Sequence, residues 1–200
     1  SNFLNLTENS RSDLYFGYFN KLDMLMNKSW AELVNFSVTS ILIAATKAQK
    51  NGTNLSVDLI IPAKEEHISL IKQKIEKAIS ANSKLALDLR SILKDLTIDY
   101  RKIDRDDTDH EVDTVPTRHH VRIVNPYPLD HETMLALIEK SDTFVGITGD
   151  QSLSEALQYG RIPFYQVMVW KENLYTNFLK TVEEVVGKKS GLFDFYSSII

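Results

Sequence analysis

Cysteine is absent from the 200-residue sequence. Its absence excludes a disulfide-linked scaffold, a zinc–thiolate site, an iron–sulfur cluster and a cysteine nucleophile. A chain of this length buries roughly 70% of the surface that the unfolded chain exposes, so a hydrophobic core can hold the fold without such links. A reducing compartment suits a cysteine-free chain, and we therefore expect a cytoplasmic protein.

Glycine and proline are scarce, with 7 and 5 residues, which argues against long disordered or fibrous stretches. Long apolar runs are also missing. None approaches the roughly 20 residues that a membrane-spanning helix needs, so we predict no transmembrane segment. The formal net charge of −4 argues against a broad surface for nucleic acid, and we predict no nucleic-acid partner.

What the sequence does contain is a regular alternation of two hydrophobic periods. Short apolar runs, typical of strands, occupy residues 14–19, 57–61, 97–103, 121–124, 143–147 and 162–166. Apolar residues at helical spacing occupy residues 30–50, 65–80, 150–159 and 171–186. Residues 84–93 form either a second helix or a bent continuation of the one before, and Asp130 is the expected N-cap of a further helix.

Strands that alternate with helices and are mostly apolar indicate a parallel sheet covered on both faces. We therefore predict an α/β fold with a doubly wound, mostly parallel sheet and helices on both faces. Residues 13–187 are expected to form one Rossmann-like domain, with a flexible leader over 1–12 and a C-terminal tail over 188–200. In such a sheet the ligand binds beyond the carboxyl ends of the strands.

Metal-binding patterns are weak. Residues 104–113 hold six acidic side chains but lack the glycine and closing glutamate of an EF-hand loop, which favours a solvated segment. His119 and His120 are adjacent in an extended segment, so their side chains point in opposite directions. His131 stands at a helix start, where it suits cap chemistry. We predict no metal site.

The most informative segment is residues 146–166, GITGDQSLSEALQYGRIPFYQ. A predicted strand ends at Gly149 and a helix begins at once, and glycine lets a ligand approach the backbone closely. The first N–H groups of the helix and the positive end of its dipole form a site suited to a phosphate. The Ser152 hydroxyl can add a hydrogen bond, and Glu155, one turn later, can accept hydrogen bonds from both hydroxyls of a ribose.

This arrangement predicts a nucleoside diphosphate that lies across the start of the helix. An ordinary capped helix, with Asp150 as its cap and Leu153, Ala156 and Leu157 packed inward, accounts for the same residues. The sequence has no G-x-G-x-x-G motif and no Walker motif, so the usual dinucleotide and P-loop interpretations do not apply.

Residues 121–166 resemble the nucleotide-binding half of GT-B glycosyltransferases. The corresponding elements, in order, are VRIVNPYPL, HETMLALIEK, SD, TFVGITG, DQSLSEAL and GRIPFY. The peptidoglycan N-acetylglucosaminyltransferases show this order, with a glutamate of the helix on the ribose. Protein-arginine rhamnosyltransferases are similar, with an acidic residue and a serine beside the pyrophosphate.

The resemblance implies a set of contacts for the donor. The diphosphate would meet Gly149, Asp150, Gln151 and Ser152, the ribose would meet Glu155, and the base would lie near Asn125, Pro126, Tyr127 and Pro128. The basic pair that many such enzymes place on the diphosphate is not evident, and Lys21 and Lys64 are the candidates. The pair of glutamates at the spacing of many retaining members is absent.

The function implied by the resemblance is that of the donor-binding domain of a glycosyltransferase, which transfers a sugar from a nucleotide diphosphate sugar to an acceptor. No cofactor is implied. Such enzymes have a second Rossmann-like half, so we expect this chain to bind the donor without turnover. Trp170, beyond a strand end, would line the sugar pocket or the interface with that half.

Two alternatives remain at the level of the sequence. One is a catalytically inactive Rossmann-like interaction module, which the exposed-looking aromatic residues Phe193, Phe195 and Tyr196 favour. The other is half of a nucleotide-sugar epimerase.

Overall fold

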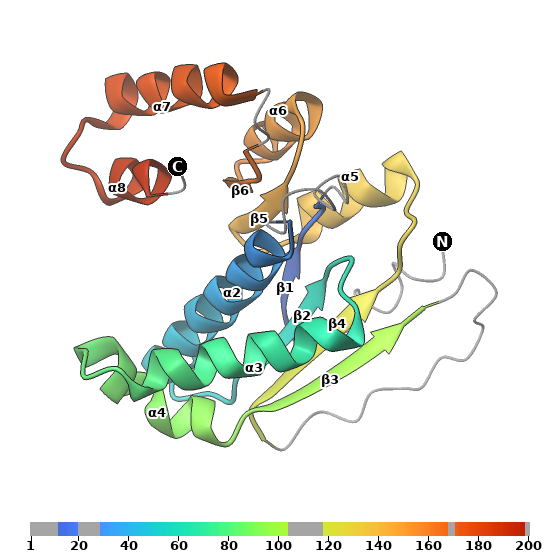
Figure 1. Cartoon of the computed structure of the whole chain (residues 1–200), viewed down its shortest axis with the longest axis vertical. Coiled ribbons are helices and arrows are strands. Elements are labelled where there is room, and N and C mark those ends of the chain that lie inside the picture. The colour runs from blue at the N-terminus through green and yellow to red at the C-terminus, as the bar shows by residue number, and fades with distance from the viewer. Residues whose placement is uncertain (1–11, 20–28, 104–117, 168–170, 199–200) are drawn as a thin grey trace.

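The computed structural model describes residues 12–19, 29–103, 118–167 and 171–198 (Figure 1). The strands are β1 (Asp13–Phe16), β2 (Ser56–Ile60), β3 (Thr97–Lys102), β4 (His120–Asn125), β5 (Phe144–Ile147) and β6 (Ile162–Tyr165). The helices are α2 (Ser29–Asn51), α3 (Glu65–Ser80), α4 (Lys84–Lys94), α5 (His131–Lys140), α6 (Asp150–Gln158), α7 (Glu172–Val186) and α8 (Gly191–Ser197). The alternation that the sequence predicts is confirmed.

The strands form two parallel sheets that meet edge to edge. One sheet has the order β1-β2-β4-β3, and the other pairs β5 with β6. A parallel bridge between Gly17 and Gly146 joins them, and the Tyr18 N–H donates to the Gly146 carbonyl over 2.8 Å. The combined strand order is therefore β3-β4-β2-β1-β5-β6. Strands β2 to β4 lie on one side of β1 and strands β5 and β6 on the other, so the strand order reverses between β1 and β5.

Gly17 and Gly146 make this junction possible because neither carries a side chain. A Cβ at Gly146 would lie 2.4 Å from the ring of Phe19, and one at Gly17 would lie 2.7 Å from the same ring. The Phe19 ring, 5% exposed, thus fills the space beside both glycines and packs against Phe36 of α2.

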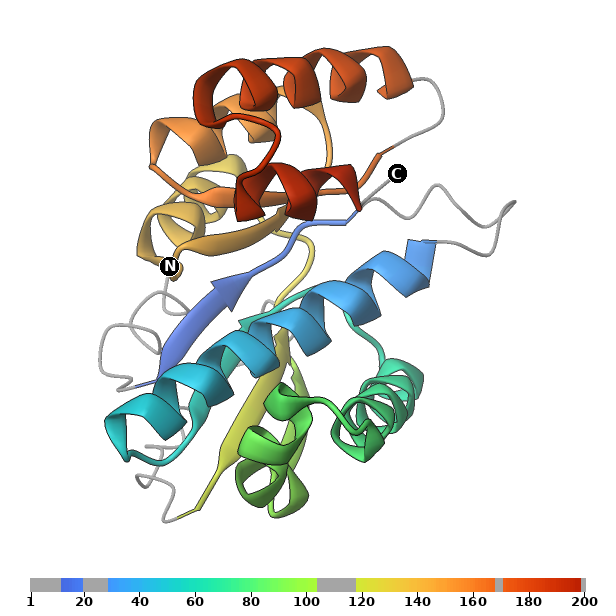
Figure 2. The ribbon, with the colours of Figure 1, turned by 90° about the vertical axis from the view of Figure 1, so that its left-hand side faces the viewer.

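Helices α2, α3 and α4 cover one face of the four-stranded sheet (Figures 1 and 2). Every second residue of the strands points into this layer, as the period of two requires. Fully buried Tyr15, Val57, Leu59, Val121 and Ile123 meet the apolar faces of these helices in one continuous cluster. The fold is therefore α/β with a mostly parallel sheet flanked by helices, as predicted.

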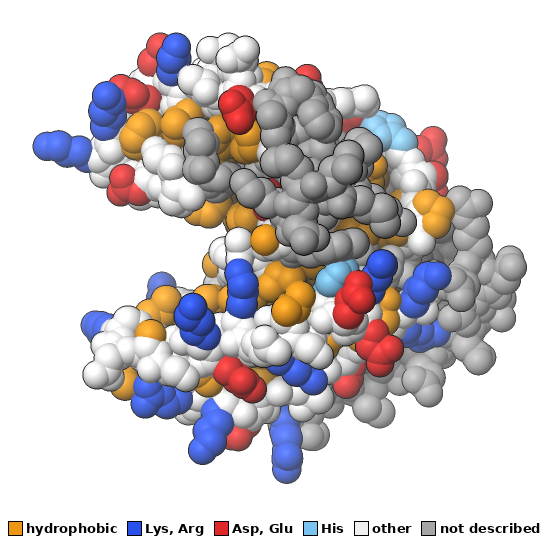
Figure 3. Space-filling model, in the orientation of Figure 1, with side chains coloured by type: hydrophobic (Ala, Val, Ile, Leu, Met, Phe, Trp, Pro, Cys, Tyr) orange, Lys and Arg blue, Asp and Glu red, His pale blue; other side chains and the backbone are white. Residues whose placement is uncertain are grey.

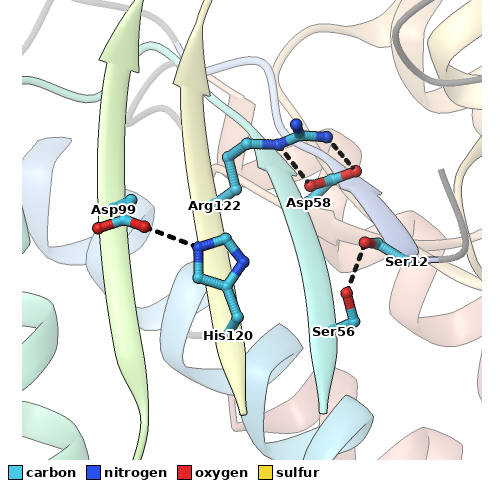
Figure 4. Close-up of polar contacts among 6 residues, drawn as sticks. All are labelled: Ser12, Ser56, Asp58, Asp99, His120 and Arg122. Carbon is cyan, nitrogen blue, oxygen red and sulfur yellow. Dashed lines mark hydrogen bonds and ion pairs between the residues drawn. The ribbon is translucent and has the colours of Figure 1, made fainter. Parts of the chain in front are cut away.

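The opposite face is mainly apolar toward the carboxyl ends of its strands. There Phe16, Ile60 and Val124 pack in a cluster with residues of α5, α6, α7 and α8. Toward the amino ends the same face carries polar side chains (Figure 4). Arg122 makes two parallel hydrogen bonds of 2.9 Å to Asp58, and His120 lies 2.8 Å from Asp99.

Most element boundaries shift by one or two residues from the sequence prediction, the first strand shifts by more, and the open question at residues 84–93 is decided. The first strand ends at Phe16 rather than at residue 19, because Gly17 forms a single bridge with Gly146 and the side chain of Phe19 lies in the core. Residues 84–93 belong to a separate helix, since Ser83 accepts a hydrogen bond from the Ala86 N–H and caps α4.

The aromatic residues near the C-terminus are not exposed, contrary to the sequence interpretation. They lie on α8, where Tyr196 is 2% exposed and Phe195 packs against Phe144 of β5 with ring centroids 5.8 Å apart. The Tyr175 hydroxyl of α7 donates to the Tyr196 carbonyl over 2.8 Å. These side chains complete a core that the strands and α7 leave open.

Figure 3 shows a deep notch between the part of the molecule formed by α7 and α8 and the part formed by α3 and α4. Apolar side chains are visible along it. Within the described ranges, no helix has both the length and the apolar character that crossing a bilayer requires.

Candidate functional site

The turn between β5 and α6 lies at the point where the strand order reverses. The helix that follows β1 covers one face of the sheet, and the helix that follows β5 packs in the cluster on the other. A crevice between the carboxyl ends of two such strands is the usual ligand position in doubly wound sheets. The segment 146–166 that the sequence singles out therefore stands at the position that the topology favours.

Gly149 is the N-cap of α6 and supplies no side chain to cap it. Its φ of 95° lies in the left-handed region that favours glycine, and nothing lies within 4 Å of the position of a Cβ. The Leu153 N–H donates to the Gly149 carbonyl over 3.1 Å and is the first N–H group to bond within the helix. The N–H groups of residues 150–152 come before it, so they have no carbonyl partner within α6. The alternative of a helix capped by Asp150 is wrong, and so is inward packing of Leu157, which is 47% exposed.

The Tyr165 hydroxyl points at this turn from the end of β6. The residue is fully buried, and its ring stacks on that of Tyr175, 5.9 Å away, within the core. The hydroxyl makes no hydrogen bond of normal geometry within the described part of the chain, although it faces the Gly149 backbone and the Asp150 carboxylate. Burial raises the pKa of Tyr165 to about 12, and Asp150 adds to the shift. Sequence reasoning missed this residue.

Lys171 brings a positive charge to the same turn. Its ammonium group contacts the Asp150 carboxylate, which joins the start of α7 to the first residue of α6. The Lys171 side chain is 24% exposed and the Asp150 side chain 62%. Sequence reasoning missed Lys171 as a site residue, because the two residues stand 21 positions apart in the chain.

The Glu155 carboxylate lies between the starts of α5 and α6. Its Oε1 accepts a hydrogen bond of 2.9 Å from the Gln151 amide and lies 3.4 Å from His131 Nε2. The side chain is 13% exposed, and its Oε2 is buried without a hydrogen-bond partner among the described residues. Buried carboxylate oxygens are normally bonded, so Oε2 has unused capacity to accept a hydrogen bond.

Ser152 and three of the residues expected near the base are less available than the sequence suggests, whereas the fourth, Pro128, is exposed. Ser152 is 8% exposed, and Pro126 is buried. The Asn125 amide donates to the Ala63 carbonyl over 2.6 Å. The Tyr127 hydroxyl donates to the Gly17 carbonyl over 2.8 Å, and its burial raises its pKa well above the ordinary value.

Tyr18, which sequence reasoning did not single out, stacks on Tyr127 with ring centroids 6.0 Å apart. It is 36% exposed. The ring of Tyr18 is therefore more accessible to a ligand beside this loop than the ring of Tyr127 is.

The predicted cations have different positions. Lys64 is the N-cap of α3, and its ammonium lies 3.7 Å from Glu66, at the start of a different helix from α6. Lys21 and Trp170 fall outside the described residues, and so does the acidic segment 104–113. Of the lysines Lys64 and Lys171, the second is the one that contacts the Gly149 turn.

The adjacent His119 and His120 direct their side chains to different partners. His119 Nδ1 accepts a hydrogen bond from the Leu55 N–H over 3.0 Å, whereas His120 faces Asp99. In the part of the chain that is described, no three histidine or acidic side chains cluster as metal ligands. A polar cavity of about 140 Å³ lies at the amino ends of β1 and β2, beside Lys47 and Asn51, and is not part of the site at Gly149.

The arrangement can bind an anion that carries a polar, hydroxylated group. The uncapped start of α6, the Tyr165 hydroxyl and Lys171 offer donors and positive charge, and the buried oxygen of Glu155 offers an acceptor one turn away. Comparison of the chain with known protein families, curated proteins and solved structures finds no match. The interpretation of the site therefore depends on its own geometry.

Proposed function

We propose that this chain binds the nucleotide diphosphate sugar of a glycosyltransferase. The observation that carries the proposal is the uncapped start of α6 at the β1–β5 junction, with the unbonded oxygen of Glu155 one turn farther along. Backbone N–H groups at 150–152 would hold the diphosphate, and Glu155 would accept hydrogen bonds from the ribose. The loop 125–128 and the ring of Tyr18 would lie toward the base.

The chemical task of such a site is to stabilise the leaving group. When the bond between the sugar's anomeric carbon and the phosphate oxygen breaks, the diphosphate takes the electron pair and gains negative charge. Fixed N–H dipoles and a hydroxyl at that position stabilise the charge without reorganising. In this proposal a second Rossmann-like half supplies the acceptor, and this chain alone binds without turnover.

Calorimetric titration with UDP, GDP, ADP and dTDP tests the proposal. We expect one base series to bind, and Glu155→Gln to weaken that nucleotide about 10- to 100-fold, because charge-assisted hydrogen bonds contribute about 1.5–3 kcal/mol. Glu184→Gln, an exposed glutamate on α7, serves as the matched control. If UDP, GDP or ADP binds, its 2′-deoxy analogue should bind the wild type more weakly and lose less on the Glu155 substitution.

An unchanged dissociation constant for Glu155→Gln would remove this residue from the site. Failure of all four nucleotides to bind the wild type would reject the proposal and favour the interaction module. The aromatic residues first considered for such a module pack into the core, so that alternative would need another surface.

A further inference from the structure

We propose that Lys171 is the cation that binds the phosphates, and that the Asp150 carboxylate is its internal competitor. The inference rests on the proposed function, since it assumes a diphosphate at the start of α6. It adds a binding residue outside the segment that resembles glycosyltransferases, together with a reason why that residue is paired when no ligand is bound.

Lys171 lies at the start of a helix that packs against β6. It follows β6 and directly precedes α7, and α7 is held against β6 by the stacking of Tyr175 on Tyr165. The Lys171 side chain is three-quarters buried, whereas the Asp150 side chain is mostly exposed. Of the two partners, the carboxylate is therefore the one with more freedom to rotate into water.

The Tyr165 hydroxyl is a second, independent sign of a ligand at this turn. It is buried, faces Gly149 and Asp150, and has no bonded partner of normal geometry among the described residues. Because a buried hydroxyl without a well-formed hydrogen bond is unfavourable, a bound phosphate oxygen would give it an acceptor of normal geometry. Such an oxygen, placed at the start of α6, would lie beside both Tyr165 and the Asp150–Lys171 pair.

A bound diphosphate and the Asp150 carboxylate would compete for the ammonium group of Lys171. The two anions repel each other, and an ion pair with an exposed partner contributes little to stability. A diphosphate carries more negative charge than a carboxylate and also bonds the helix N–H groups. Lys171 therefore exchanges Asp150 for the phosphate on binding, while Asp150 keeps only its backbone N–H in the site.

Calorimetric titration of the whole chain with inorganic pyrophosphate, UDP and ADP tests this exchange. The variants are Lys171→Met, Lys171→Arg, Asp150→Asn and the control Lys180→Met, an exposed lysine on α7. We expect Lys171→Met to weaken binding at least tenfold, Lys171→Arg to retain most of it, and Asp150→Asn to tighten it several-fold. Lys180→Met should bind as the wild type does, and circular dichroism should show all variants folded.

The outcomes separate the two proposals. If the wild type binds a nucleoside diphosphate and Lys171→Met binds it equally well, the exchange is wrong while the proposed function stands. If Asp150→Asn weakens binding as much as Lys171→Met does, the carboxylate is part of the site and competition is wrong. If the wild type binds neither pyrophosphate nor any of UDP, GDP, ADP and dTDP, the proposed function fails and the exchange fails with it.

Discussion

Tyr165 and Tyr175 form a stacked pair whose two hydroxyls differ in their partners. The Tyr175 hydroxyl donates to the Tyr196 carbonyl, whereas the Tyr165 hydroxyl makes no normal hydrogen bond in the described part of the chain. We expect Tyr175→Phe to destabilise the fold by about 1 kcal/mol, and Tyr165→Phe to leave its stability unchanged or raise it slightly. Urea unfolding followed by circular dichroism measures both.

The pair of variants also separates a structural role from a binding role. Equal destabilisation by Tyr165→Phe and Tyr175→Phe would mean that the Tyr165 hydroxyl is bonded within the fold, and would withdraw it from the candidate site. A stable Tyr165→Phe variant with weakened pyrophosphate binding is the result that the geometry favours.

The site could be predicted from the sequence only where its residues are close together in the chain. Gly149, Ser152 and Glu155 occupy one strand-to-helix turn, which local patterns reveal. Tyr165 and Lys171 reach the same turn from the far side of β6. No local pattern indicates that approach, because it depends on the pairing of β5 with β6 and on the packing of α7.

At the scale of single elements, helix α3 has a buried histidine in its first turn. His67 is 1% exposed, and its Nδ1 accepts a hydrogen bond of 2.9 Å from the Lys64 N–H. Burial lowers the pKa of His67 below its ordinary value of 6.5, so the unfolded chain binds this proton at a higher pH than the folded chain does. The contribution of His67 to stability is therefore complete above about pH 6.5 and falls as the pH drops through that value.

Urea midpoints measured between pH 8 and pH 5 test this. His67→Gln should be less stable than the wild type at pH 8 and should lose less on acidification. Lys72→Gln, an exposed residue on the same helix, should keep the wild-type slope. A wild type and a His67→Gln variant with parallel pH profiles would contradict the assignment.

Most elements could be predicted because one face of each is apolar with a clear period. The errors occur where tertiary contacts decide, as at Gly17, where the predicted strand gives way to a single bridge with Gly146 and Phe19 packs beside both glycines. The pairing of Asp58 with Arg122 was also beyond the sequence. Both residues lie in segments that the sequence predicts as strands. They are 64 positions apart in the chain, and their contact requires β2 and β4 to be neighbours in the sheet.

At the scale of the whole molecule, the β1–β5 junction depends on the space left by Gly146. A methyl group there would lie 2.4 Å from the Phe19 ring and 3.2 Å from the Gly17 Cα. Because overpacking of a core costs about 1–3 kcal/mol, we expect Gly146→Ala to lower the free energy of unfolding by that amount. Chemical denaturation measures it.

A second substitution identifies the cause. Phe19→Leu should recover part of the loss in the Gly146→Ala background, because it removes the closest atom but not the Gly17 backbone. Gly191→Ala, where nothing lies within 4 Å of the added Cβ, should leave stability nearly unchanged. Strict additivity of Gly146→Ala and Phe19→Leu would show that the ring and the glycine are not coupled.

The central place of β1 has a consequence for synthesis on the ribosome. β1 is the first described strand to emerge, yet its neighbours are β2 on one side and β5, far along the chain, on the other. Until β5 is translated, one edge of β1 offers unpaired backbone groups to any passing nascent chain. A chain that ends before Phe144 would therefore expose this edge of β1 and be prone to aggregate. A pause in elongation between β1 and β5 would favour aggregation for the same reason.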